Sequence, residues 1–148
     1  MEIRAATTED IPALMRQGAE FAAFAGTGVD TAKAESMLGE LISSNAGCVI
    51  VLTDALADVV GGIIGVLSEE LWSRRVVAQE LVWWVAPEYR RGGVRLLRAF
   101  EAWAAAMDAA DVVVSDLAAS DEAVGHLYES RGYTLLERQW VRRVEDIG

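Results

Sequence analysis

The segment from Ala46 to Leu67 constrains the fold of this chain more than any other, because it is apolar over the length of a membrane span. Asp54 and Asp58 lie near its middle, and each would cost about 2.5–3.5 kcal/mol in the hydrocarbon of a bilayer. Both aspartates suit a turn between two short apolar runs, residues 48–52 and residues 59–67. We therefore expect two neighbouring strands here and no membrane span.

Apolar residues in the rest of the chain alternate between helical spacing and short strand-like runs. Further strands are expected at residues 2–5, 76–85, 111–115, 133–136 and 139–144, and helices at about residues 8–25, 30–43, 93–107 and 121–130. Pro87 ends the strand before it, because proline has no N–H for a ladder. The pattern predicts an α/β (α+β) fold, a mixed central sheet of about six to seven strands flanked by about four helices, in the order β-α-α-β-β-β-α-β-α-β-β.

Length, charge and composition exclude several kinds of partner and site. The length of 148 residues suits a single domain, residues 1–148, and the net charge of −10 disfavours nucleic acid as a partner. Cys48 is the one cysteine and His126 the one histidine, which excludes an intrachain disulfide framework and metal sites rich in cysteine or histidine. No signal-like segment opens the chain, so we expect a cytoplasmic protein that does not bind a membrane. We also expect no metal, given the single cysteine and the single histidine.

The segment from Val85 to Val94 joins a strand end, a glycine-bearing turn and the start of a long helix. Helix N-termini present backbone N–H groups and a positive dipole end to anions. Arg90, Arg91 and Arg95 add positive charge to an otherwise acidic chain. The segment indicates either a phosphate or pyrophosphate site or an ordinary strand-to-helix turn with surface arginines. A P-loop is excluded, because the Gly-Lys-Ser/Thr ending is missing.

The chain resembles the GNAT family of acetyl-CoA-dependent N-acetyltransferases. The family motif Arg/Gln-x-x-Gly-x-Gly/Ala matches at Arg90 and Gly93. Residues 3–11, 60–66 and 121–133 look like the family's opening strand and helix start, its third strand and its Asn-x-x-Ala-x-x-Leu-Tyr-x-x-x-Gly-Phe segment, in the family's order and spacing. Arg95 stands where the family has a second small residue, and the following leucine pair comes early, which predicts a shortened turn.

This resemblance implies roles for particular residues. Tyr128 would protonate the departing thiolate of coenzyme A, and Asp121 replaces the family's frequent asparagine as a helix cap. Glu80 is a candidate general base, directly or through water, with Glu69 and Glu70 as further candidates. The residues expected to bind the cofactor are Trp84 and Val85 through their backbone, together with Arg90, Arg91, Gly92, Gly93, Val94, Arg95 and Asp121.

The expected function is transfer of an acetyl group from acetyl-CoA to a primary amine of a small molecule or peptide. Two alternatives stay open: a GNAT-fold protein that binds acyl-CoA without transfer, and an interaction module that forms a homodimer. The residues also predict some placements. Trp83 and Trp84 should lie on opposite faces of their strand, His126 and Tyr128 on different faces of their helix, and Cys48 in the core.

Overall fold

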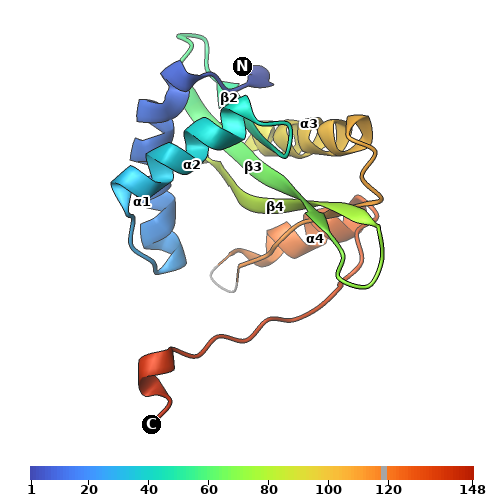
Figure 1. Cartoon of the computed structure of the whole chain (residues 1–148). Coiled ribbons are helices and arrows are strands. Elements are labelled where there is room, and N and C mark those ends of the chain that lie inside the picture. Colours follow the sequence, from blue (N-terminus) through green and yellow to red (C-terminus); the bar gives the residue numbers. More distant parts are fainter. Residues whose placement is uncertain (118–119) are drawn as a thin grey trace. The chain divides into compact units, whose positions relative to one another are not determined.

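The computed structural model describes residues 1–117 and 120–148, which form two compact units, Met1–Ser115 and Asp116–Gly148. The first unit contains a five-stranded sheet in the order β1-β2-β3-β4-β5 (Figure 1). Its strands are β1 (Glu2–Ala5), β2 (Gly47–Thr53), β3 (Val59–Glu69), β4 (Val76–Val85) and β5 (Asp111–Val113). Strands β1 to β4 pair antiparallel with their neighbours, and β5 pairs parallel with β4, so the sheet is mixed as predicted.

Three helices cover the two faces of this sheet. They are α1 (Ile11–Ala25), α2 (Thr31–Ser43) and α3 (Gly93–Ala106), and the short 3-10 helices η1 (Thr8–Asp10) and η2 (Pro87–Gly92) precede α1 and α3. Helices α1 and α2 lie on one face and α3 lies on the other (Figure 1). Of the two predicted caps of this helix, Asp30 and Thr31, it is Asp30 that caps α2, since its carboxylate accepts a hydrogen bond from the Lys33 N–H at 3.1 Å.

The apolar segment from Ala46 to Leu67 forms most of the hairpin of β2 and β3. Every residue of β2 is buried, and Asp54 shapes the turn by accepting hydrogen bonds from the N–H groups of Leu56 and Asp58. In the ranges that the structure describes, no helix is both long and apolar enough to cross a membrane. The prediction of two strands around an aspartate turn is therefore confirmed.

The second unit contains α4 (Glu122–Ser130) and a 3-10 helix, η3 (Val144–Asp146). The strands predicted at residues 133–136 and 139–144 are wrong: the structure has five strands in its described ranges, and residues 134–143 form none. Their local pattern favours extended chain, but a strand also needs a neighbouring strand to pair with. These residues have no ladder partner among the described residues and stay exposed, with Leu135 and Trp140 76% and 93% accessible.

Candidate functional site

The ladder between β4 and β5 stops well before β4 itself ends. It consists of three pairs, of which the last is Gln79↔Val113, whereas β4 continues to Val85. From Glu80 to Val85, β4 therefore pairs with β3 on one side and has no ladder pair with β5 on the other, within the described part of the chain. We call this side of residues 80–85 the β4 edge. The ladder ends at Val113 because β5 itself ends there, two residues earlier than the strand predicted at residues 111–115.

A β-bulge at Leu81 decides which way the side chains of the β4 edge point. Ile64 pairs with Val82, but the next residue of β3, Gly65, pairs with Glu80, so one extra residue is inserted in β4. Residues paired in an antiparallel ladder share a face. A Cβ at Gly65 would lie 2.3 Å from the Phe100 ring of α3, so Gly65 and Glu80 both lie on the α3 face.

Glu80 is a buried acid with a specific backbone partner. The residue is 5% exposed, and its Oε2 accepts a hydrogen bond from the Ser115 N–H at 2.9 Å. Burial raises the pKa of the Glu80 carboxyl, and the hydrogen bond from Ser115 opposes part of that rise. The carboxyl is thus held inside the unit at the point where the β4–β5 ladder ends.

Trp83 and Trp84 lie on opposite faces of the sheet, as predicted. A Cβ at Gly93 of α3 would contact the Trp83 ring at 3.4 Å, which places this ring on the α3 face. The Trp84 ring covers Gly62 and packs against the core cluster beneath α1 and α2. Its Nε1 donates a hydrogen bond to Oε1 of Gln17 at 2.7 Å, which ties the end of β4 to α1.

The arginine-glycine turn is folded as the 3-10 helix η2, which runs directly into α3. The N–H of Tyr89 donates to the Ala86 carbonyl, and the N–H of Gly93 donates to the Arg90 carbonyl. The Gly93 amide therefore already has a partner within the turn. Arg90, Arg91 and Arg95 are exposed at this helix start, and Arg95 also donates to the Met1 carbonyl at 3.2 Å.

The two glycines of the turn differ in how closely the sheet approaches them. Gly92 is buried, and a Cβ there would lie 2.4 Å from Cδ2 of Leu52 on β2. A Cβ at Gly93 would make ordinary contacts with Trp83 and Val85. In this structure the tighter requirement for glycine therefore comes from helix-to-sheet packing at Gly92.

In the second unit, α4 presents Tyr128 and His126 differently. Tyr128 is 8% exposed and its ring lies 5.6 Å from the Tyr133 ring, whereas the side chain of His126 is 76% exposed. The prediction that these two residues occupy different faces is confirmed. Asp121 caps α4 by accepting a hydrogen bond from the Ala123 N–H at 3.0 Å, also as predicted.

The family model for the acetyltransferase (GNAT) family matches residues 15–133, most of the chain. This chain belongs to the GNAT family. Membership makes it an acyltransferase by descent, and GNAT proteins generally use acetyl-CoA. No curated protein matches the chain in sequence.

Solved structures of other acetyltransferases share this GNAT fold. One described as a probable acetyltransferase is 20% identical with a TM-score of 0.79, and the match covers 99% of each chain. The ribosomal-protein-alanine N-acetyltransferase from Brucella melitensis is 18% identical, with a TM-score of 0.74, over 97% of this chain and 99% of that one. An acetyltransferase from Trypanosoma brucei is 16% identical, with a TM-score of 0.75 and the same coverages. At such identities, the likeness shows the fold alone.

The residues of this GNAT chain fit a coenzyme A ester in two respects. The β4 edge lies beyond the last ladder pair with β5, where the backbone N–H and C=O of Val85 could meet amides of an extended ligand, whereas the Trp84 carbonyl faces Gly61 on β3. Arg90 and Arg91 offer exposed positive charge to phosphates at the start of α3. The Gly93 amide could join them only by giving up the Arg90 carbonyl.

Two residues that contact this part of β4, Ser115 and Gln17, were not predicted from the sequence. Ser115 donates its N–H to Glu80, and Gln17 accepts from Trp84. Both pairs join residues far apart in the chain, so no local pattern announces them. The glutamine on the apolar side of α1 was the one available signal for a buried polar contact.

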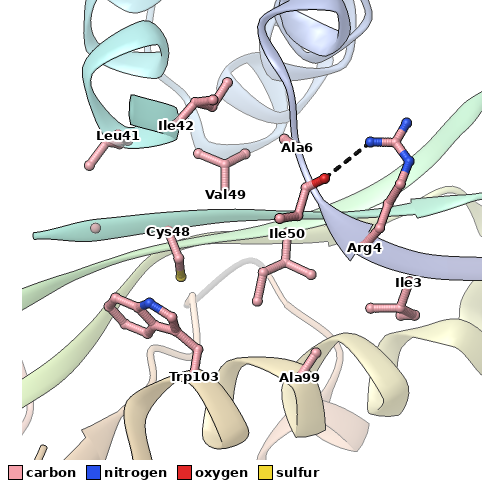
Figure 2. A pocket seen from close by; sticks show the side chains of 12 residues that line it. Ile3, Arg4, Ala6, Leu41, Ile42, Cys48, Val49, Ile50, Ala99 and Trp103 are labelled. Carbon is pink, nitrogen blue, oxygen red and sulfur yellow. Dashed lines mark hydrogen bonds between the residues drawn. The ribbon is translucent and has the colours of Figure 1, made fainter. Parts of the chain in front are cut away.

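A separate apolar pocket of about 390 Å³ lies near the opposite edge of the sheet, around strands β1 and β2. Figure 2 shows Trp103 of α3 on one side of β2 and Leu41 of α2 on the other, with Cys48 between the strands and Trp103. Burial raises the pKa of the Cys48 thiol to about 12, so this cysteine is a neutral core residue, as predicted.

Proposed function

We propose that this GNAT chain transfers the acetyl group of acetyl-CoA to a primary amine of a small molecule or peptide. The observation that carries the proposal is the β4 edge, which continues to Val85 after pairing with β5 ends at Gln79↔Val113. Cytoplasmic location and a homodimer stay predictions.

The chain's own residues would hold the donor along this edge. The backbone of Val85 is proposed to bind the amides and thioester carbonyl of the extended arm. Trp84 was predicted to share this role, but its carbonyl faces β3. Arg90, Arg91 and Arg95 are proposed to bind the phosphates, because guanidinium groups form charge-assisted hydrogen bonds with phosphate oxygens. The amides of Gly92, Gly93 and Val94 and the α4 cap at Asp121 complete the predicted set.

Acetyl transfer forms a bond from the amine nitrogen to the acyl carbon and breaks the bond from that carbon to sulfur. When bound, acetyl-CoA supplies an activated acyl group with a thiolate as leaving group. The Tyr128 hydroxyl is proposed to give its proton to that sulfur. Glu80 was predicted to receive the amine proton, directly or through water. Its carboxyl is buried and accepts from the Ser115 N–H, so we propose that solvent water takes the proton that the amine loses as the amide forms.

Calorimetry with acetyl-CoA, followed by thiol release with a panel of primary amines, tests the proposal. We expect saturable binding and amine-dependent thiol release by the wild-type chain. Arg91→Gln should weaken acetyl-CoA binding by about tenfold through loss of a charge-assisted contact. Arg74→Gln removes an exposed arginine from the β3–β4 hairpin and serves as the control.

Two negative outcomes of this test have different meanings. No saturable binding at millimolar acetyl-CoA would overturn the proposal. Binding without thiol release, for every amine in the panel, would favour the alternative of a GNAT-fold protein that holds acyl-CoA without transferring its acyl group.

A further inference from the structure

We propose that Glu80 is a positioning residue: its carboxylate takes the place of a backbone acceptor at the end of the β4–β5 ladder and holds the end of β5 beside the β4 edge. This inference rests on the proposed function, because it concerns how the same edge is kept ready for acetyl-CoA. It assigns Glu80 a task different from proton transfer.

The hydrogen bonds at the end of the ladder carry the argument. Backbone pairing of β4 with β5 ends at Gln79↔Val113, and two residues later the Ser115 N–H donates to the Glu80 side chain at 2.9 Å. A glutamate side chain extends beyond its own backbone, so it can accept from an N–H that lies beyond the end of the ladder. Glu80 therefore adds one side-chain contact between β4 and the segment that follows β5.

The β-bulge makes this contact available. Because Leu81 is the extra residue in β4, Glu80 lies opposite Gly65 and shares its α3 face. Trp83, which pairs with Ile63, lies on the same face. Without the inserted residue, the alternation of the strand would carry the next side chains to the other face. The bulge thus lies at the residue that follows Glu80 and at the start of the β4 edge.

Burial makes the contact between Glu80 and Ser115 costly to lose. Glu80 is 5% exposed, so its carboxyl has little contact with solvent, and one of its oxygens is engaged by Ser115. A general base must come within hydrogen-bond distance of the proton that it removes. Holding Ser115 requires only an acceptor oxygen, whereas removing a proton requires a carboxylate, and this difference can be tested.

Two substitutions separate the tasks. Glu80→Gln keeps an oxygen that can accept from Ser115 but cannot act as a base, and Glu80→Leu removes both abilities. Glu40→Leu, on an exposed position of α2, is the control for loss of a carboxylate. The readouts are residue-resolved amide hydrogen exchange at Ser115, the Kd of acetyl-CoA by calorimetry, and kcat with a saturating amine.

We expect the Ser115 amide to exchange about tenfold faster in Glu80→Leu and to stay within about threefold of wild type in Glu80→Gln. The Kd of acetyl-CoA should rise about tenfold in the leucine variant, and glutamine should restore it. In Glu80→Gln, kcat should stay within about threefold of wild type, because the glutamine oxygen still accepts from Ser115. If Glu80 were the base, kcat would fall, because an amide cannot remove a proton. Glu40→Leu should change none of the three.

Several results would overturn the inference. One is a Ser115 amide that exchanges freely in the wild-type chain, and another is a leucine variant with unchanged exchange and affinity. Equal loss of kcat in both variants, at unchanged Kd, would make Glu80 the base. If the wild-type chain binds no acetyl-CoA, the proposed function fails, and the exchange of Ser115 then decides by itself whether Glu80 holds β5.

Discussion

At the scale of the residue, Tyr128 offers the most direct test of acetyl transfer. Tyr128→Phe keeps the buried ring beside Tyr133 but removes the hydroxyl, so kcat should fall by about 10²–10⁴-fold if that hydroxyl protonates the thiolate. The Kd of acetyl-CoA should change little. Tyr133→Phe removes a hydroxyl from the partner ring and is the matched control. Unaltered turnover in Tyr128→Phe would assign Tyr128 to packing.

Glu80 gives a second prediction at this scale, on stability. Burial raises the pKa of its carboxyl in the folded chain, so the folded state binds this proton more tightly than the unfolded state does. Such a group loses stabilising free energy as the pH rises from the unfolded pKa, about 4.3, through the folded value. Glu80→Gln carries no such charge, so its free energy of unfolding should rise relative to wild type between pH 4 and pH 8. Urea unfolding measures this, with exposed Glu40→Gln as control; parallel pH curves for Glu80→Gln and wild type would contradict it.

At the scale of the element, Asp10 joins β1 to α1. Its carboxylate accepts two hydrogen bonds from Arg4, at 2.8 and 2.9 Å, and one from the Thr7 N–H. The hydrogen bond from Arg4 is the main cause that lowers the pKa of Asp10, so the stabilisation is present above the unfolded pKa and is lost as the pH falls through the folded one. Asp10→Ala should lower the free energy of unfolding by about 1.5–3 kcal/mol at pH 7, and by less in acid. Urea titrations at several pH values would show this; a loss that does not shrink in acid would rule out the charged pair as its source.

The packing of α3 on the sheet gives the next prediction. Gly92→Ala would place a Cβ against Leu52, a fully buried side chain, so it should cost about 1–3 kcal/mol of stability. Gly93→Ala meets Trp83 only at ordinary contact distance and should cost clearly less. Thermal unfolding of the two variants compares them directly. Equal costs would show that the close approach at Gly92 is relieved by movement of Leu52.

At the scale of the whole molecule, the net charge of −10 bears on the acceptor. A strongly acidic protein attracts cationic amines over the distance that salt leaves unscreened, which is about 10 Å at 0.1 M. We expect kcat/KM for a polycationic amine to fall between 50 mM and 500 mM salt by about an order of magnitude, and less for a monocationic amine. Steady-state kinetics at several salt concentrations would measure it, and equal salt dependence for both amines would argue against steering.

The sequence was most informative where a structural feature depends on neighbouring residues. The end of β4 at Val85 was predicted because Pro87, two residues later, cannot continue the strand. The turn at Asp54 and the caps at Asp30 and Asp121 were predicted because their hydrogen bonds reach only two to four residues along the chain. Four segments in order, the one around Arg90 and residues 3–11, 60–66 and 121–133, indicated the GNAT family for the same reason, since each is a run of neighbouring residues.

By itself, the sequence determined that a mixed sheet flanked by helices would form, and that Trp83 and Trp84 would lie on opposite faces. Only the tertiary structure decided which faces the α3 side, because the bulge at Leu81 appears only once β3 pairs with β4. It also decided that residues 134–143 form no strand, since an extended segment becomes a strand only when another backbone pairs with it. The contact of Glu80 with Ser115 joins residues 35 positions apart, and hydrogen bonds of that kind exist only after the chain has folded.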